Sequence, residues 1–220
     1  MQTLALSVLG KDLDDALSFN RLKADVKKLS SRFRLVVAHD ARFQFERKEK
    51  RPLPDAPTEA DLERYADSLV QLGKIFTTKL SEDLVPAMQM NAHHLGLVQA
   101  EREGESTLGK IVAVKKEILE KLFAQNVVPI LAPITKTKSG RLCFVSADAV
   151  AARLAGELRA DMIFFIDDCG SGKKEEREKF ARESLMNGAK RAFVSDLSGL
   201  EAVALRGERR SSEITLSPST

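Results

Sequence analysis

The chain has 220 residues, of which 43% are hydrophobic and 30% are charged, and its formal net charge is only +3. This composition is sufficient for the core of one large domain, and so small a charge does not predict a nucleic-acid surface. No apolar stretch approaches the roughly 20 residues that a membrane span requires. Two cysteines are too few for a disulfide scaffold and show no metal-site spacing, and the N-terminus lacks the features of a signal peptide. We therefore expect a cytoplasmic protein with neither nucleic-acid nor membrane partners.

Short apolar runs alternate with segments of helical periodicity along the chain, which predicts an α/β fold. The predicted strands are Thr3–Leu9, Arg34–Ala38, His94–Gln99, Lys110–Val114, Val127–Ile134, Met162–Ile166, Arg191–Ser195 and Ser212–Leu216. The predicted helices are Asp14–Leu29, a helix from Thr58 through Leu72, Thr77–Met90 with a break at Pro86, Lys116–Ala124, Ala147–Leu158, Lys173–Met186 and Gly199–Arg206. The charged, proline-containing segment Phe43–Pro57 is expected to be a loop, and Thr58 with Asp61 is expected to cap the following helix. No repeat or linker divides the sequence, so we expect a single domain over residues 1–220.

The stretch from Val127 to Gly172 predicts a place for a binding site. Its two apolar runs are of the kind that is buried on both faces of a parallel sheet, and a helical segment lies between them. The residues that follow the second run include Asp167, Asp168, Gly170 and Gly172. Open α/β sheets bind ligands at the carboxyl ends of their parallel strands. We therefore expect a ligand near these carboxylates and glycines.

The same stretch resembles the amino acid kinase family, and within it is most similar to the N-acetylglutamate kinases. These enzymes have a strand ending in IAPI, a hairpin, the sequence NADxxA at the start of a helix, and a strand ending in TD. The counterparts here are Ala132-Pro133-Ile134, Ser146-Ala147-Asp148 and Ile166-Asp167. The resemblance covers nearly the full chain and is strongest after about Gly109. It implies a three-layer αβα sandwich with a mainly parallel central sheet.

The resemblance also implies the parts of a phosphoryl-transfer site. The family is expected to use two lysines, an aspartate that organises them, and glycine-rich turns that face phosphate. Asp148 matches the aspartate, although it could equally be a plain helix N-cap. Lys179 matches the second lysine, although it could instead be a solvated charge on a highly charged helix. If the chain is a kinase, we expect Asp148 and Lys179 to converge in one cleft, with Lys11 or Arg42 as the second cation.

The first half of the chain departs from the family pattern. Ser7 stands where the family has its first lysine, and the HGGG turn has become His39-Asp40-Ala41-Arg42. Glycines in such a turn let the backbone approach phosphate, whereas a carboxylate at Asp40 would repel it and Arg42 could offset that repulsion. The candidate substrate-binding residues are Gly10, His39, Arg42 and Ser146.

The substrate and nucleotide contacts implied by the family are also altered. Phe144 replaces an asparagine, and the region of Thr58 lacks the expected arginine, so N-acetylglutamate is not the expected substrate. The loop after Asp168 is much shorter than in the family. Its GSGK sequence lacks the spacing of a Walker A loop and could be a simple turn before a charged helix. The candidate nucleotide-binding residues are Asp167, Asp168, Gly170, Gly172 and Lys173.

Two hypotheses follow. The first is a small-molecule kinase that uses ATP and Mg²⁺ and phosphorylates a carboxylate, phosphate or hydroxyl acceptor other than N-acetylglutamate. The second is a non-catalytic family member with a binding, storage or regulatory role. The resemblance implies a homodimer or larger homo-oligomer in either case. Adjacent His93 and His94 do not predict a metal pair, because neighbouring side chains point apart, and no metal site is expected.

Overall fold

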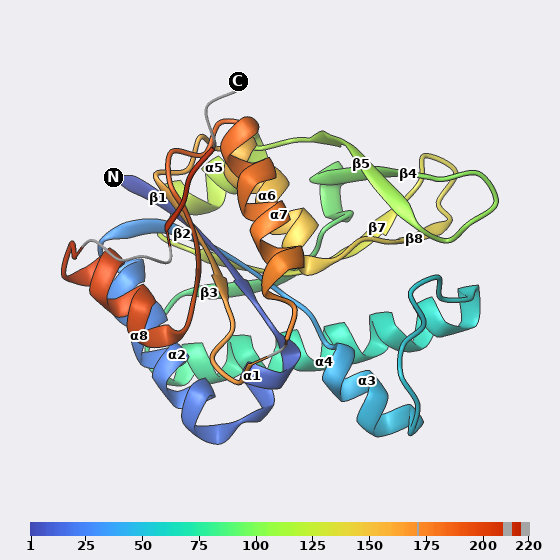
Figure 1. The fold of residues 1–220 in the computed structure, drawn as a ribbon, viewed down its shortest axis with the longest axis horizontal. Helices are drawn as coiled ribbons and strands as arrows, with labels where there is room; N and C mark the ends of the chain where they lie inside the picture. The colour runs from blue at the N-terminus through green and yellow to red at the C-terminus, as the bar shows by residue number, and fades with distance from the viewer. Residues whose placement is uncertain (171, 209–212, 217–220) are drawn as a thin grey trace.

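A seven-stranded sheet forms the centre of the molecule in the computed structural model, which describes residues 1–170, 172–208 and 213–216 (Figure 1). The strand order is β11-β10-β9-β1-β2-β6-β3. The strands are β1 (Gln2–Val8), β2 (Phe33–His39), β3 (Ala87–Asn91), β6 (Val128–Ala132), β9 (Met162–Ile166), β10 (Ala192–Ser195) and β11 (Glu213–Ile214). Neighbouring strands of this sheet are parallel except β10 and β11, which are antiparallel.

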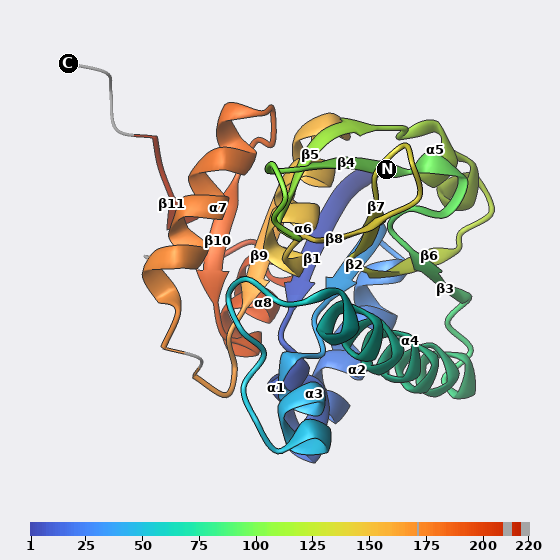
Figure 2. The ribbon, with the colours of Figure 1, turned by 90° about the vertical axis from the view of Figure 1, so that its right-hand side faces the viewer.

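Helices cover both faces of the sheet, so the fold is the predicted three-layer sandwich (Figure 2). One face packs against α2 (Ala16–Ser30), α4 (Glu59–Glu82) and α8 (Leu197–Leu200), the last continued by one π-helical turn, Glu201–Leu205. The other face packs against α5 (Glu117–Ala124), α6 (Ala147–Glu157) and α7 (Lys174–Met186). Because side chains alternate along a strand, Leu4 and Leu6 of β1 enter the first apolar layer and Ala5 enters the second.

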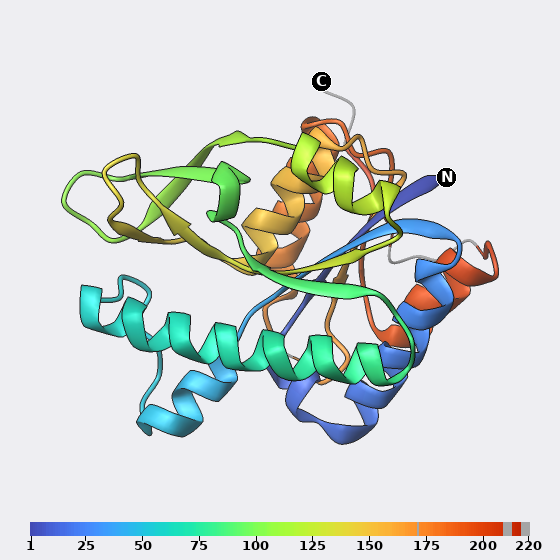
Figure 3. The same cartoon turned by 180° about the vertical axis from the view of Figure 1, so that it is seen from behind.

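Smaller elements sit around the carboxyl ends of the parallel strands. Two short helices, α1 (Gly10–Asp14) and α3 (Arg42–Glu49), follow β1 and β2 directly. Two antiparallel hairpins lie above the N-terminal half of the long helix α4 (Figure 3). They are β4 (Val98–Arg102) with β5 (Gly109–Val114), and β7 (Ile134–Lys136) with β8 (Leu142–Phe144). A 3₁₀ turn, His94–Gly96, precedes β4.

Three predicted elements were wrong. The helix predicted over Thr77–Met90 is the end of α4 followed by strand β3, because Leu84 adopts a positive φ of 62° and the next residues pair with β6. The loop predicted over Phe43–Pro57 begins with helix α3. The strand predicted over His94–Gln99 is a 3₁₀ turn that leads into β4.

The predicted capping box at Thr58 is confirmed. The Thr58 hydroxyl accepts the Asp61 N–H at 3.2 Å, and the Asp61 carboxylate accepts the Thr58 N–H at 3.1 Å. This reciprocal pair begins the unbroken 24-residue helix α4. Within the part of the chain that the structure describes, no helix is long and apolar enough to cross a membrane.

Candidate functional site

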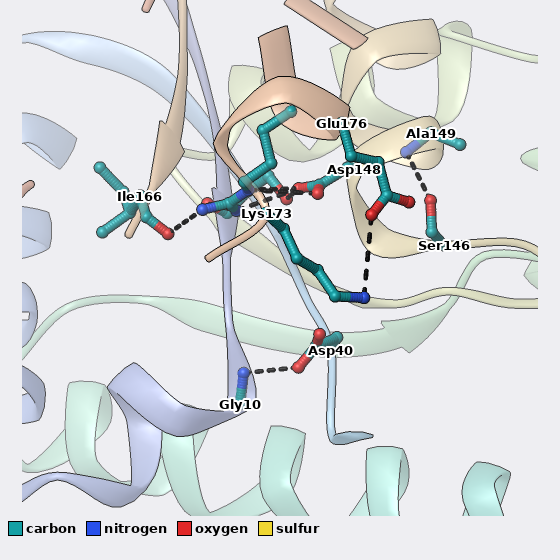
Figure 4. Close-up of polar contacts among 10 residues, drawn as sticks. Gly10, Asp40, Ser146, Asp148, Ala149, Ile166, Lys173 and Glu176 are labelled. Carbon is teal, nitrogen blue, oxygen red and sulfur yellow. Dashed lines mark hydrogen bonds and ion pairs between the residues drawn. The ribbon is translucent and has the colours of Figure 1, made fainter. Parts of the chain in front are cut away.

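The candidate site lies at the carboxyl ends of β1, β2 and β9, where the N-termini of α1, α6 and α7 also meet (Figure 4). Ser7 belongs to β1, Asp40 directly follows β2, and Asp148 lies in the first turn of α6. This is the edge of the sheet at which parallel α/β folds bind ligands. Asp167 and Asp168, which the sequence predicts to lie near a ligand, follow β9 at this same edge, and ligand binding there stays a prediction.

Asp148 is held by a hydroxyl and a guanidinium. The Ser7 hydroxyl donates to Asp148 Oδ1 at 2.5 Å, and Arg177 Nη2 lies 3.0 Å from the same oxygen. Arg177 Nε reaches Oδ2 at 3.2 Å. The Asp148 side chain is 14% exposed and that of Arg177 is 0% exposed. The cation that accompanies Asp148 is therefore a buried arginine of α7.

The other N–H groups of the Arg177 guanidinium donate hydrogen bonds to backbone carbonyls. Its Nη1 donates to the carbonyl of Ile166 at the end of β9, and its Nη2 donates to the carbonyl of Ser7 at 3.3 Å. A guanidinium has five N–H donors in a fixed plane, and these bonds engage four of them. Arg177 thus joins β1, β9, α6 and α7 in one hydrogen-bonded cluster.

Sequence reasoning missed Arg177, although a signal for it exists. Arg177 stands in the charged run KKEEREK, which was interpreted as a solvated face. Yet Arg177, Ala181 and Ser184 are the buried residues of α7, and their spacing of four and three is the helical repeat. The inward stripe of α7 therefore begins with Arg177, two residues before the predicted Lys179.

Lys179 is exposed on α7, and no bond between Lys179 and Asp148 is found among the described residues. The expected convergence of these two side chains is replaced by the pairing of Asp148 with Arg177. Lys11, the other predicted catalytic cation, is also exposed, and its Nζ donates to the carbonyl of Cys169 at 2.9 Å.

The turn after β2 presents a carboxylate to the N-terminus of α1. The Gly10 N–H donates to Asp40 Oδ1 at 2.5 Å, and the Gln44 amide donates to the Gly10 carbonyl at 2.7 Å. A Cβ at position 10 would clash with the side chains of Gln44 and Asp40, so the close approach requires glycine. Burial raises the pKa of the Asp40 carboxyl, while the Gly10 N–H opposes that shift.

A cavity of about 40 Å³ separates Asp40 from Asp148. That volume holds a few water molecules at most. Arg42, Ser146 and Lys173 also line it, so three of the predicted contacts surround one space. Ser146 caps α6 by accepting the Ala149 N–H at 3.1 Å, and the Lys173 ammonium lies 3.8 Å from Glu176 (Figure 4).

The segment after β9 is joined by hydrogen bonds to α1 and α2. The Asp168 carboxylate accepts the Ser18 hydroxyl at 2.6 Å and the Leu197 N–H at 3.1 Å. The next residue, Cys169, donates its N–H to Asp12 Oδ1 at 2.9 Å, and its carbonyl accepts Lys11. Burial raises the pKa of the Asp12 carboxyl, and burial likewise raises the pKa of the Cys169 thiol.

The remaining candidates lie apart from the cavity. His39 is fully buried on the α4 side of β2, close to Gly73 and Gln89. Asp167 follows β9 and donates its backbone N–H to the Ser195 carbonyl at 3.0 Å. Gly170 and Gly172 have φ angles of 67° and 72°, in the left-handed region that favours glycine. Ser171, the centre of the GSGK sequence, lies outside the described residues.

Comparison with known proteins identifies the lineage. The profile of the amino acid kinase family matches residues 7–170, which is more than half of the chain. The chain belongs to the amino acid kinase family. Acetylglutamate kinase of Bacillus licheniformis is 30% identical over 112 residues, which are 49% of this chain and 43% of that protein. The match thus spans less than half the length of this relative.

Solved structures share this fold at low sequence identity. The smu.665 protein of Streptococcus mutans superposes with a TM-score of 0.73 at 18% identity, covering 88% of this chain and 94% of that one. Carbamate kinase from Giardia lamblia bound to AMP-PNP gives a TM-score of 0.69 at 11% identity, covering 98% and 99%. These likenesses support the family's three-layer fold for nearly the whole chain.

Two groups that would contact the phosphates of ATP at this site are engaged by other parts of the chain in this structure. The Gly10 N–H that would face a phosphate already donates to Asp40, and Lys11 already binds the Cys169 carbonyl. Among residues 1–170, 172–208 and 213–216, no group of three or more His, Cys, Asp or Glu side chains could hold a metal ion. The polar groups at this edge of the sheet are largely satisfied by one another.

Proposed function

We propose that this amino acid kinase family member is a non-catalytic binding or regulatory protein that has kept the fold and lost phosphoryl transfer. One observation carries the proposal: the cation paired with Asp148 is Arg177, whose side chain is 0% exposed and donates to Asp148, Ile166 and Ser7. A cation so enclosed cannot contact a phosphoryl group at the cavity.

The expected cost of this arrangement is large. Phosphoryl transfer depends almost entirely on positioning and on neutralising charge at the transferred group. Removing one preorganised group that stabilises the transition state typically costs about 3 to 4 kcal/mol, and each 1.4 kcal/mol is about tenfold in rate. Ser7 stands in place of one lysine, and Asp148 pairs with Arg177 and not with Lys179 among the described residues, so neither expected lysine accompanies Asp148.

The negative charge that a phosphate would bring is also supplied by the protein itself. Asp40 places a carboxylate oxygen on the Gly10 N–H, at the helix N-terminus where a phosphate oxygen would be received. A phosphate would have to displace this carboxylate and would be repelled by it. The built-in pairs Asp40–Gly10 and Arg177–Asp148 therefore stabilise the fold at the location where the family implies a ligand.

Calorimetry with Mg²⁺ and millimolar ATP tests the proposal directly. We expect no saturable heat, and no ADP formation when carboxylate, phosphate and hydroxyl acceptors are supplied. The acetylglutamate kinase of Bacillus licheniformis, with ATP and N-acetylglutamate, serves as the positive control. Micromolar ATP binding that is lost in Asp148→Asn would overturn the proposal.

A second candidate function is a small-molecule kinase, and one observation favours it. Lys173 and Arg42 line the same cavity as Asp148, so two cations other than Arg177 stand near the organising carboxylate. Such an enzyme would be a cytoplasmic homo-oligomer that uses ATP and Mg²⁺ on an acceptor other than N-acetylglutamate. ADP formation that requires an acceptor and is lost in Lys173→Ala would establish this candidate.

A further inference from the structure

A second and larger cavity lies between the helices on the α4 side of the molecule. It has a volume of about 570 Å³ and is bounded by α1, α2, α3 and α4. Its apolar wall is formed by Leu13, Phe19, Leu72 and Ile75. None of its lining residues lines the Asp148 cavity, so the two spaces are separate. We call this space the helical groove.

The apolar wall of the helical groove is partly open to solvent. Ile75 is 55% exposed, and Leu17, which follows the lining residue Ala16 on α2, is 77% exposed. Small-molecule sites typically measure about 300 to 1,000 Å³ and are lined mainly by apolar side chains with a few polar groups. The helical groove falls in that size range, and five of its eleven lining residues are apolar.

Polar groups at one end of the groove give it a positive character. Asp14 forms an ion pair with Arg47 at 2.9 Å, so these two charges compensate each other. Lys48 also lines the groove, and no ion pair of Lys48 is found within the described part of the chain. The remaining charge on the wall is therefore one ammonium group.

Gln44 also lines the groove, but its amide group is turned toward Gly10. Its amide nitrogen donates to Gly10, but its Oε1 is buried without a hydrogen-bond partner among the described residues. Buried polar atoms are normally satisfied, and those that are not call for a missing partner. Because this oxygen is sealed beside Gly10, a molecule in the groove does not reach it, and the groups available for recognition are the apolar wall and Lys48.

We propose that the helical groove binds a small amphipathic anion, with an apolar body against Leu13, Phe19, Leu72 and Ile75 and an anionic end near Lys48. Burying the body removes apolar surface from water on both sides, which is the main favourable contribution. The ammonium of Lys48 selects the sign of the head group. This inference does not depend on whether the Asp148 site is catalytic.

Fluorescence titration with anilinonaphthalene sulfonate, an aromatic anion, tests the groove on the full chain. Decanoate should displace the dye, whereas decyltrimethylammonium, with a similar body and the opposite charge, should not. Ala16→Trp places an indole in the groove from an exposed position and should abolish saturable binding. Circular dichroism and urea unfolding confirm that this variant remains folded.

Two charge reversals provide the matched comparison. Lys48→Glu should weaken decanoate binding by about threefold to tenfold, because a single near-surface charge contributes modestly. Lys27→Glu makes the same change at an exposed position of α2 outside the groove and should leave binding unchanged. Equal effects of the two reversals would contradict an anionic end at Lys48.

Three other outcomes would overturn the proposal. They are the absence of saturable dye binding in the wild-type protein, displacement by the cationic competitor as effectively as by decanoate, and unchanged binding in Ala16→Trp. Sedimentation velocity distinguishes the remaining occupant, a second copy of the chain. A wild-type dimer that Ala16→Trp converts to a monomer would assign the groove to self-association instead of a small molecule.

Discussion

Arg177 and Asp148 form a buried ion pair in which Nη2 lies 3.0 Å from Oδ1, and the arginine is fully enclosed by the fold. In a kinase of this family, the cation beside the organising aspartate is expected to face the transferred phosphoryl group. Here the cation beside Asp148 holds β1 and β9 to α6 and α7 through the Ser7 and Ile166 carbonyls. The pair has thereby become part of the protein's core.

Truncating Arg177 should therefore destabilise the protein strongly. Arg177→Ala removes the guanidinium from Asp148, which keeps the Ser7 hydroxyl as a donor, and from the Ser7 and Ile166 carbonyls. Breaking a buried pair on one side costs about 3 to 5 kcal/mol. Urea unfolding at pH 7 measures the change in the free energy of unfolding.

The matched control is Arg182→Ala, which removes an exposed arginine of the same helix from its pair with Glu178. Its effect should stay within about 0.5 kcal/mol. Combining Arg177→Met with Asp148→Asn should recover part of the loss, because no charge then remains buried unpaired. A loss below about 1 kcal/mol in Arg177→Ala would show that the cluster does not stabilise the fold.

The hydrogen bond from the Cys169 N–H to Asp12 leads to a prediction about the reactivity of the Cys169 thiol. Burial and the nearby Asp12 carboxylate raise the pKa of the Cys169 thiol, and only the thiolate reacts rapidly. Asp12→Ala removes the acceptor of the Cys169 N–H together with the carboxylate, so alkylation of Cys169 by N-ethylmaleimide at pH 7.5 should accelerate by about tenfold per unit of pKa restored.

Peptide mapping by mass spectrometry separates the two cysteines. Cys143 is buried in the apolar layer on the side of α5, α6 and α7, and it should react at the same slow rate in the wild type and in Asp12→Ala. Acceleration of both thiols would indicate general loosening, and acceleration of neither would show that Asp12 does not hold this segment.

The sequence predicted the fold where the pattern was local. The apolar run Met162–Ile166 is β9 at the predicted bounds, and Ser146-Ala147-Asp148 begins α6 as expected. Both segments carry strong periodic or capping signals, so tertiary contacts did not change their structure. The helix predicted through Met90 failed because Ala87–Asn91 becomes a strand only by pairing with β6.

The chemistry of the site could not be predicted from the sequence to the same degree. Three basic residues in or just before α7, namely Arg177, Lys179 and Lys173, are equivalent in composition, and only the packing of the helix decides which one is buried. The bond between Asp40 and Gly10 joins residues thirty positions apart and depends on the register of β1 with β2. Such pairings arise from the fold, so a linear pattern does not reveal them.

The capping box of α4 should make a measurable local contribution. Thr58→Ala removes the hydroxyl that accepts the Asp61 N–H, and loss of such a cap costs about 1 kcal/mol. Urea unfolding at pH 7 should show this loss. Ser81→Ala, near the other end of the same helix, removes a hydroxyl that only donates to the Thr77 carbonyl and should change the free energy by less than about 0.5 kcal/mol. Equal losses in both variants would refute a specific capping role.

His39 should make the protein less stable in mild acid. Burial lowers the pKa of His39 from 6.5 to about 4, so the folded state keeps it neutral while the unfolded state takes up a proton below pH 6.5. Its effect is absent at pH 7.5, grows as the pH falls from 6.5 to 4, and reaches about 2 kcal/mol of lost stability at pH 5. The raised pKa values of Asp12 and Asp40 act in the opposite direction, since these carboxyls take up protons more readily in the folded state.

Comparison of the wild type with His39→Gln isolates the contribution of the histidine. Urea unfolding at pH 7.5 and pH 5 should show that the variant loses less free energy of unfolding on acidification than the wild type does. His94→Gln, an exposed position, should retain the wild-type loss, and an unchanged acid loss in His39→Gln would contradict the assignment.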